Sequence, residues 1–139
     1  MTKPARRGGA SSDRGAAAVE FALLLPLLVL IVFGVIDFGR AINAQITLTQ
    51  AAREGARALA LGQATYQSRA LSAAIGLNGI TVTEQPDVLG VTGCPAGSAQ
   101  TGDDAVVHVT YTFTFVTPIG YLFGPTKTLT AVGVMPCET

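Results

Sequence analysis

An uninterrupted apolar segment near the N-terminus constrains this chain more than any other feature. Residues 16–36 read AAAVEFALLLPLLVLIVFGVI, and the only charged residue among these 21 is Glu20. A helix of that length spans about 31 Å, which matches the hydrocarbon core of a bilayer. A buried helix of a soluble protein is the alternative, but such helices are usually shorter, and no comparably apolar segment follows as a packing partner. The segment therefore predicts one transmembrane helix.

The charges on the two sides of this segment predict its orientation. The first 15 residues carry four basic side chains and one acidic side chain, a net charge of +3. Beyond residue 36 the chain has seven acidic and five basic side chains, a net charge of −2, although Arg40, Arg53 and Arg57 lie on that side. The positive-inside rule then places the N-terminus in the cytoplasm. We expect a single-pass protein of the cytoplasmic (inner) membrane, with a cytoplasmic leader (1–15), a transmembrane helix (16–36) and an extracytoplasmic part (37–139).

The composition offers little for catalysis or ligand binding. Nine basic and nine acidic residues give a net charge of zero, which argues against a nucleic-acid partner. His108 is the only histidine, and the sequence has no phosphate-binding glycine loop, nucleophile motif or dinucleotide fingerprint. We expect no enzyme activity, no catalytic residue, no metal, no cofactor and no small-molecule substrate.

Two cysteines, Cys94 and Cys137, lie far apart in the sequence and lack the C-x-x-C spacing of a zinc or redox site. Outside the cytoplasm two such thiols tend to oxidise, and closing a loop of this size is worth a few kcal/mol. The predicted topology therefore favours a Cys94–Cys137 disulfide. Two free thiols in a reducing compartment are the alternative.

The segment from Asp37 to Leu61 contains no proline and predicts a helix that continues from the membrane. Within it, Asp37 can pair with Arg40, and Glu54 with Arg57, at i,i+3 spacing. Two apolar stripes follow the helical period and can pack either against the chain's own sheet or against a partner. One comprises Ile42, Ile46, Thr49, Ala56 and Ala60, and its narrow neighbour comprises Ala44, Leu48, Ala51, Gly55 and Leu59. Gly55 permits close helix approach, while Pro26 and Gly34 lie within the span, so these three are candidate helix-packing residues.

The remaining sequence predicts a short helix and a small sheet. Residues 64–77 have a helical apolar face that stops at Asn78-Gly79. Apolar and polar residues alternate over 107–115, which is typical of a strand with one buried face, and shorter strands are expected at 80–83 and 129–135. The predicted fold class is α+β: a long N-terminal helix, a short second helix and a small antiparallel sheet, which is a pilin-like plan.

The sequence around the start of the span contains a recognisable motif. A basic arm ends in Arg14-Gly15, three alanines and a valine follow, and Glu20-Phe21 opens the apolar helix. This string resembles the processing site of type IV pilin-like precursors, particularly the Flp type. The resemblance implies that a membrane-embedded prepilin peptidase cuts between Gly15 and Ala16, and that Glu20 becomes the fifth residue of the mature chain. The new α-amino group is cationic at neutral pH, and the carboxylate of Glu20 can pair with it in the same or a neighbouring subunit.

Further motifs extend this resemblance. The stretches EFALLLP (20–26), GVIDFGR (34–40) and QAAREGAR (50–57) are similar to the TadE-like family of the tight-adherence (Flp pilus) system, and together with the processing motif they cover residues 14–62. The resemblance implies a minor pseudopilin-like protein that assists pilus assembly through helix association, with other Flp-type pilins and assembly proteins as partners. TadG-like relatives share the N-terminal motif but are much longer. The alternative is an unprocessed, membrane-anchored domain that binds an envelope partner or a ligand.

Overall fold

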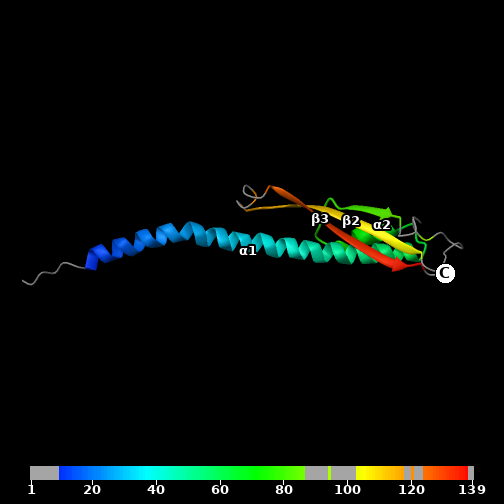
Figure 1. Ribbon diagram of the computed structural model, residues 1–139, viewed down its shortest axis with the longest axis horizontal. Coiled ribbons are helices and arrows are strands. Elements are labelled where there is room, and N and C mark those ends of the chain that lie inside the picture. Colours follow the sequence, from blue (N-terminus) through cyan, green and yellow to red (C-terminus); the bar gives the residue numbers. More distant parts are fainter. Residues whose placement is uncertain (1–9, 87–93, 95–102, 118–119, 121–123, 138–139) are drawn as a thin grey trace, which may run out of the picture.

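The computed structural model describes residues 10–86, 94, 103–117, 120 and 124–137, with side chains from residue 15 onward. The elements follow in the order α1 (Ala10–Ala60), α2 (Tyr66–Ala73), β1 (Thr81–Gln85), β2 (Asp104–Thr114) and β3 (Thr126–Pro136). Helix α1 runs along the length of the described structure, and α2 and the sheet lie beside its C-terminal half (Figure 1). This arrangement confirms the predicted α+β plan.

The N-terminal half of α1 has no packing partner among the described residues. The helix has 51 residues, which corresponds to a length of about 77 Å, and it continues through Pro26. Large apolar side chains from Val19 to Ile36 are between 37% and 75% exposed. Within residues 15–60 the most apolar stretch has a mean hydropathy of 2.8, and none of it is buried. By its length and composition, this is the one helix in the described part of the chain that could cross a membrane.

The C-terminal half of α1 packs against the chain's own α2 and sheet. Ala44, Leu48, Ala51 and Leu59 are at most 7% exposed, and Gly55 is buried with them. This resolves the two options for the narrow stripe in favour of an internal core. Ile42 and Ile46, on the neighbouring stripe, remain 45% and 53% exposed.

The sheet is antiparallel with the order β1-β2-β3, so β2 is central. The alternation predicted for 107–115 is confirmed, because Val107, Val109 and Phe113 are buried toward α1 while the residues between them are more exposed. The strands extend beyond the predicted ranges at most of their ends, although β1 begins at Thr81 and β2 ends at Thr114, each one residue inside the prediction. Pairing of Asp104 with Pro136 lengthens β2 and β3 at one end, and pairing of Thr114 with Thr126 lengthens β3 at the other, since backbone hydrogen bonding continues past the apolar residues that made the strands visible in the sequence.

Each helix ends shortly before a glycine that has a positive φ. Gly62 has a φ of +66°, and its N–H bonds to the carbonyl of Leu59, which closes α1 with a left-handed residue. Helix α2 is shorter than the predicted 64–77: it begins at Tyr66 and ends at Ala73. The reason is that residues 75 and 76 form a turn in which Gly76 has a φ of +83°.

Strand β3 approaches α1 most closely at Gly133. A Cβ built on this glycine would overlap the carbonyl group of Ala52 and lie 2.9 Å from the backbone nitrogen of Arg53. Gly133 also pairs with the buried Val107 of β2, so its backbone is held by the neighbouring strand as well as by α1. Only a residue without a side chain fits between the strand and the helix backbone at this point.

Candidate functional site

The residues of the predicted processing site lie on an exposed, helical part of the chain. Gly15 is inside α1, which begins at Ala10, so the helix starts before the predicted end of the leader. Gly15 and Ala16 are exposed, and no atom lies within 4 Å of a Cβ added at Gly15. The segment is therefore accessible from all sides, but a peptidase would first have to unwind a helical turn to reach the peptide bond.

Glu20 is also exposed on α1, one helical turn after Ala16. No salt bridge of Glu20 is found in the part of the chain that the structure describes. Its carboxylate lies within the apolar half of the helix, where a charged group is costly unless it has a partner. The geometry leaves this carboxylate available to another chain or to the α-amino group of a processed N-terminus.

The three predicted helix-packing residues have different environments. Pro26 is exposed, and Gly34 is partly buried. Gly55 is buried where α1 meets α2 and β2: an added Cβ would lie 3.1 Å from the Cβ of Ala70 and 3.2 Å from Cγ1 of Val107. The close approach at Gly55 is thus between elements of one chain.

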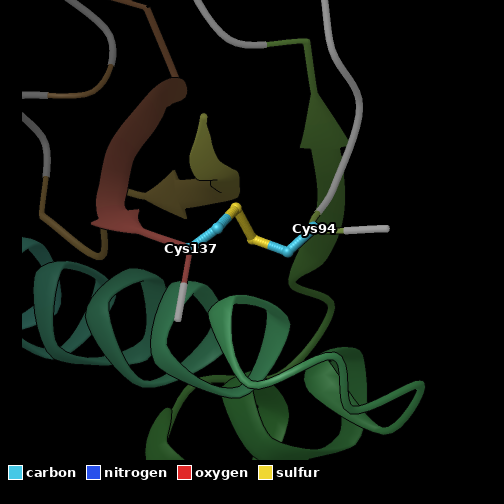
Figure 2. Close-up of a disulfide and its surroundings, with 2 residues drawn as sticks. All are labelled: Cys94 and Cys137. Carbon is cyan, nitrogen blue, oxygen red and sulfur yellow. A yellow bond between two sulfur atoms is a disulfide. The ribbon is translucent and has the colours of Figure 1, made fainter. Parts of the chain in front are cut away.

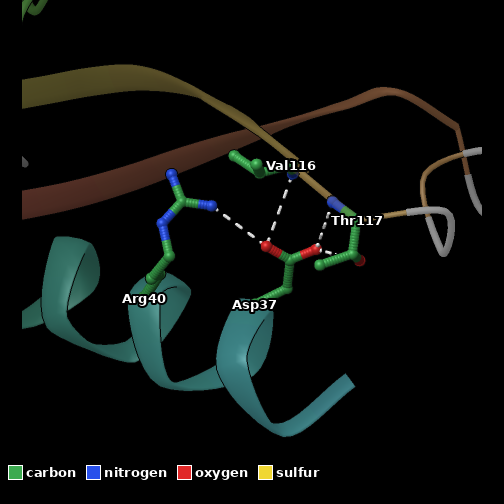
Figure 3. Close-up of polar contacts among 4 residues, drawn as sticks. All are labelled: Asp37, Arg40, Val116 and Thr117. Carbon is green, nitrogen blue, oxygen red and sulfur yellow. Dashed lines mark hydrogen bonds and ion pairs between the residues drawn. The ribbon is translucent and has the colours of Figure 1, made fainter. Parts of the chain in front are cut away.

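A buried carboxylate joins the sheet to α1 where the apolar half of the helix ends. Asp37 is only 2% exposed, although it follows directly after the predicted span. It accepts hydrogen bonds from the backbone N–H groups of Val116 (3.4 Å) and Thr117 (3.2 Å) and from the Thr117 hydroxyl. Figure 3 shows these bonds converging on the two carboxylate oxygens. We call Asp37, Arg40, Val116 and Thr117 the junction cluster.

Arg40 completes the junction cluster. Its guanidinium donates to Asp37 over 3.0 Å, which confirms the predicted i,i+3 pair, and it also lies 5.2 Å from the centre of the Phe113 ring. The hydroxyl of Thr117 is the largest influence that lowers the pKa of Asp37 below its ordinary value of 3.8. Burial opposes this, and the backbone N–H groups and Arg40 lower the pKa further. Asp37 therefore remains ionised and holds the end of β2 against the helix.

The Asp37→Asn variant should unfold at a lower temperature than wild type at pH 7. The reason is that the amide NH2 group of asparagine is a donor and cannot accept the hydrogen bonds that the N–H groups at this site donate. Because the folded state lowers the pKa of Asp37, its stabilising contribution is complete above the unfolded value and is lost as the pH falls through the folded value. The difference in unfolding temperature between the variant and wild type should therefore shrink below about pH 4. Thermal unfolding of both chains in detergent, followed by near-UV circular dichroism from pH 7 to pH 3, measures it.

The control for this substitution is Glu84→Gln, which removes an exposed carboxylate from the edge strand β1 and should leave the unfolding temperature unchanged. If the unfolding temperature of Asp37→Asn stayed below that of wild type by the same amount over the whole pH range, the charge of Asp37 would not contribute to stability.

The two cysteines are joined at the other end of the domain. Cys94 and Cys137 form a disulfide with a Cα–Cα distance of 5.6 Å and a separation of 43 residues (Figure 2). The backbone N–H of Cys137, directly after β3, donates to the carbonyl of Asp103 directly before β2. The disulfide fits the predicted pairing and connects the end of β3 to the segment between β1 and β2.

Potential metal ligands and charged side chains were compared over the described residues. No group of three or more potential metal ligands occurs among them, and His108 is half-buried on the outer face of β2. Glu54 pairs with Arg69 of α2 at 3.6 Å, and not with Arg57 as the spacing predicts. These three line a shallow pocket of about 190 Å³ between the ends of the two helices, which offers charged contacts but no reactive group.

Two residues of structural importance have only weak signals in the sequence. Asp37 is visible as the first charge after the apolar segment, but nothing in its surroundings indicates its bonds to residues 79 and 80 positions away. Gly133 interrupts a run of β-formers in Val132-Gly133-Val134, a pattern typical of a close backbone approach.

Comparison with known proteins finds a family match in the N-terminal part of the chain. Residues 15–57 match the family model described as TadE-like protein, which confirms the resemblance carried by the motifs in this region. No curated protein and no solved structure was found to match the chain.

Proposed function

We propose that this chain, which carries the TadE-like segment at residues 15–57, is a minor pseudopilin-like component of a Flp pilus machine. It is processed by a prepilin peptidase between Gly15 and Ala16, and it acts through helix association and not through catalysis. Its partners are other Flp-type pilins and pilus assembly proteins.

The observation that carries this proposal is the contrast between the two halves of α1. The C-terminal half supplies the core of the domain, whereas the apolar half contributes nothing to it. Burying apolar surface is favourable by about 25 cal/mol per Å², so such a helix needs a membrane or similar helices around it. A single apolar helix suggests a single-pass anchor, and the same helix can pack against pilin helices when it leaves the lipid.

The charge distribution supports one orientation of this anchor. With residues 1–15 in the cytoplasm, the basic leader follows the positive-inside rule, and residues 37–139 lie outside the inner membrane. The disulfide is compatible with an oxidising extracytoplasmic compartment. Removal of the leader takes away three net positive charges, which would otherwise oppose extraction of the helix from the headgroup layer.

The intact mass of the membrane protein tests the proposal. When the chain is produced together with its prepilin peptidase, the recovered protein should lack 15 residues and begin at Ala16. A catalytically inactive peptidase should leave the full chain. A wild-type protein that stays uncut in the presence of the active peptidase would favour the alternative, an unprocessed anchor for a domain that binds an envelope partner.

Glu20 should act after processing. Glu20→Gln keeps the size of the side chain but removes the charge that pairs with the α-amino group of Ala16, so it should be cleaved normally and recover less pilin partner. Co-purification of tagged variants with Flp-type pilin from detergent-solubilised membranes measures this loss. Glu20→Asp, which keeps the charge, should restore much of the recovery. Equal recovery by Glu20→Gln and wild type would remove the charge-pairing role.

A further inference from the structure

The β2–β3 hairpin points back toward the apolar half of α1. Strand β2 contacts α1 near Gly55 through Val107 and ends beside Asp37, so it runs opposite to the helix. Strand β3 then returns along the helix: the carbonyl of Thr130 accepts a bond from Gln45 (2.8 Å), and Gly133 lies against Ala52. In Figure 1 the C-terminal end of β2 and the start of β3 lie over the middle of α1, on the side of the free N-terminal half.

The junction cluster fixes how far the hairpin reaches. Asp37 is the first residue after the predicted span, and the N–H groups of Val116 and Thr117 bond directly to its carboxylate. The polar layer of a bilayer extends about 5–8 Å beyond the hydrocarbon core on each side. With the span at residues 16–36, the end of β2 lies within this layer.

The side chains at this level suit a lipid interface. Val116 is 75% exposed and Phe38, on the neighbouring helix position, is 69% exposed. Aromatic and apolar residues without charge are typical of protein segments that contact the membrane interface.

We propose that the domain contacts the lipid surface on its own side of the membrane through Val116, which follows β2 and lies at the same level along α1 as Phe38. The bilayer then holds the domain at two points, the α1 span and the hairpin. This inference requires that α1 spans the membrane at residues 16–36, but it does not depend on processing, on orientation or on a role in a pilus.

The absence of tryptophan from the sequence provides a direct test. A single tryptophan is introduced by Val116→Trp, by Phe38→Trp as a reference at the same level, and by Val134→Trp as a control. Val134 is 53% exposed on β3, and its neighbour Gly133 contacts α1 at Ala52, about 23 Å along the helix from Asp37. Each full-length variant is reconstituted into phosphatidylethanolamine–phosphatidylglycerol vesicles with or without phosphatidylcholine brominated on its acyl chains.

The brominated lipid should quench most of the emission of the tryptophan at position 116, to the same degree as the one at position 38, and leave the one at position 134 unaffected. Equal, weak quenching at positions 116 and 134 would overturn the proposal. A blue-shifted emission at position 116 that bromine does not quench would also overturn it, because protein and not lipid would then cover the side chain. No peptidase or pilin is present, so the result is independent of the proposed function.

Discussion

Gly133→Ala should lower the stability of the domain more than any other single methyl group added to it. The new Cβ would overlap the Ala52 carbonyl group, and neither the strand nor the helix can move without disturbing the buried Val107 and Ala131 beside it. Forcing extra volume into a packed core costs about 1–3 kcal/mol and occasionally more, and a backbone neighbour cannot rotate away as a side chain can. For a domain of this size we expect the unfolding temperature to fall by about 10 °C or more.

Thermal unfolding in detergent, followed by near-UV circular dichroism, measures this change. Gly39→Ala is the matched control, because Gly39 is exposed on α1 and an added Cβ meets nothing within 4 Å. The control should be neutral or slightly stabilising, since alanine favours a helix over glycine. If Gly133→Ala unfolded within a degree or two of wild type, β3 would not lie against α1 as described.

Gly15→Leu should abolish removal of the leader. The structure places Gly15 inside a helix, so a peptidase that needs an extended backbone has to unwind the chain there. Glycine lowers the cost of unwinding by roughly 0.5–1 kcal/mol relative to alanine and leaves room for the protease to approach the backbone. Leucine removes both advantages. With active peptidase present, the variant should accumulate as the full chain, while wild type loses its 15 leader residues.

Intact mass spectrometry of the membrane fraction distinguishes the two forms. Gly39→Leu makes the same change at another exposed glycine of α1 and should be processed like wild type. Processing of Gly15→Leu at the wild-type rate would place the cleavage determinants elsewhere, or would show that the peptidase does not act at this bond.

Much of the fold could be predicted from the sequence because its signals are local. The apolar segment and the absence of proline from 37 to 61 define the long helix. The alternation in β2 identified both the strand and its buried face, because the period of a strand directly sets which residues face the core. Errors at the element ends were a few residues and came from backbone pairing and turns, which side-chain patterns do not record.

The contacts that orient the domain on α1 could not be predicted, because they join residues that are distant in the sequence. Asp37 has a local partner in Arg40, and nothing in the sequence adds its hydrogen bonds from Val116 and Thr117. In the same way, Glu54 has a local candidate in Arg57 but pairs with Arg69, since α2 brings that guanidinium across the gap between the helices. Spacing along one helix identifies possible partners, and tertiary packing selects among them.

Helix α1 passes from the exposed apolar half into the domain core without a break in its secondary structure, from Ala10 to Ala60. The junction cluster and the close contact at Gly133 then fasten the sheet to the same rod at two well-separated levels. If a neighbouring molecule rotates or lifts the apolar half of α1, the sheet must therefore rotate or rise with it. The rotation of α1 about its own axis sets which faces of the domain are turned toward its surroundings.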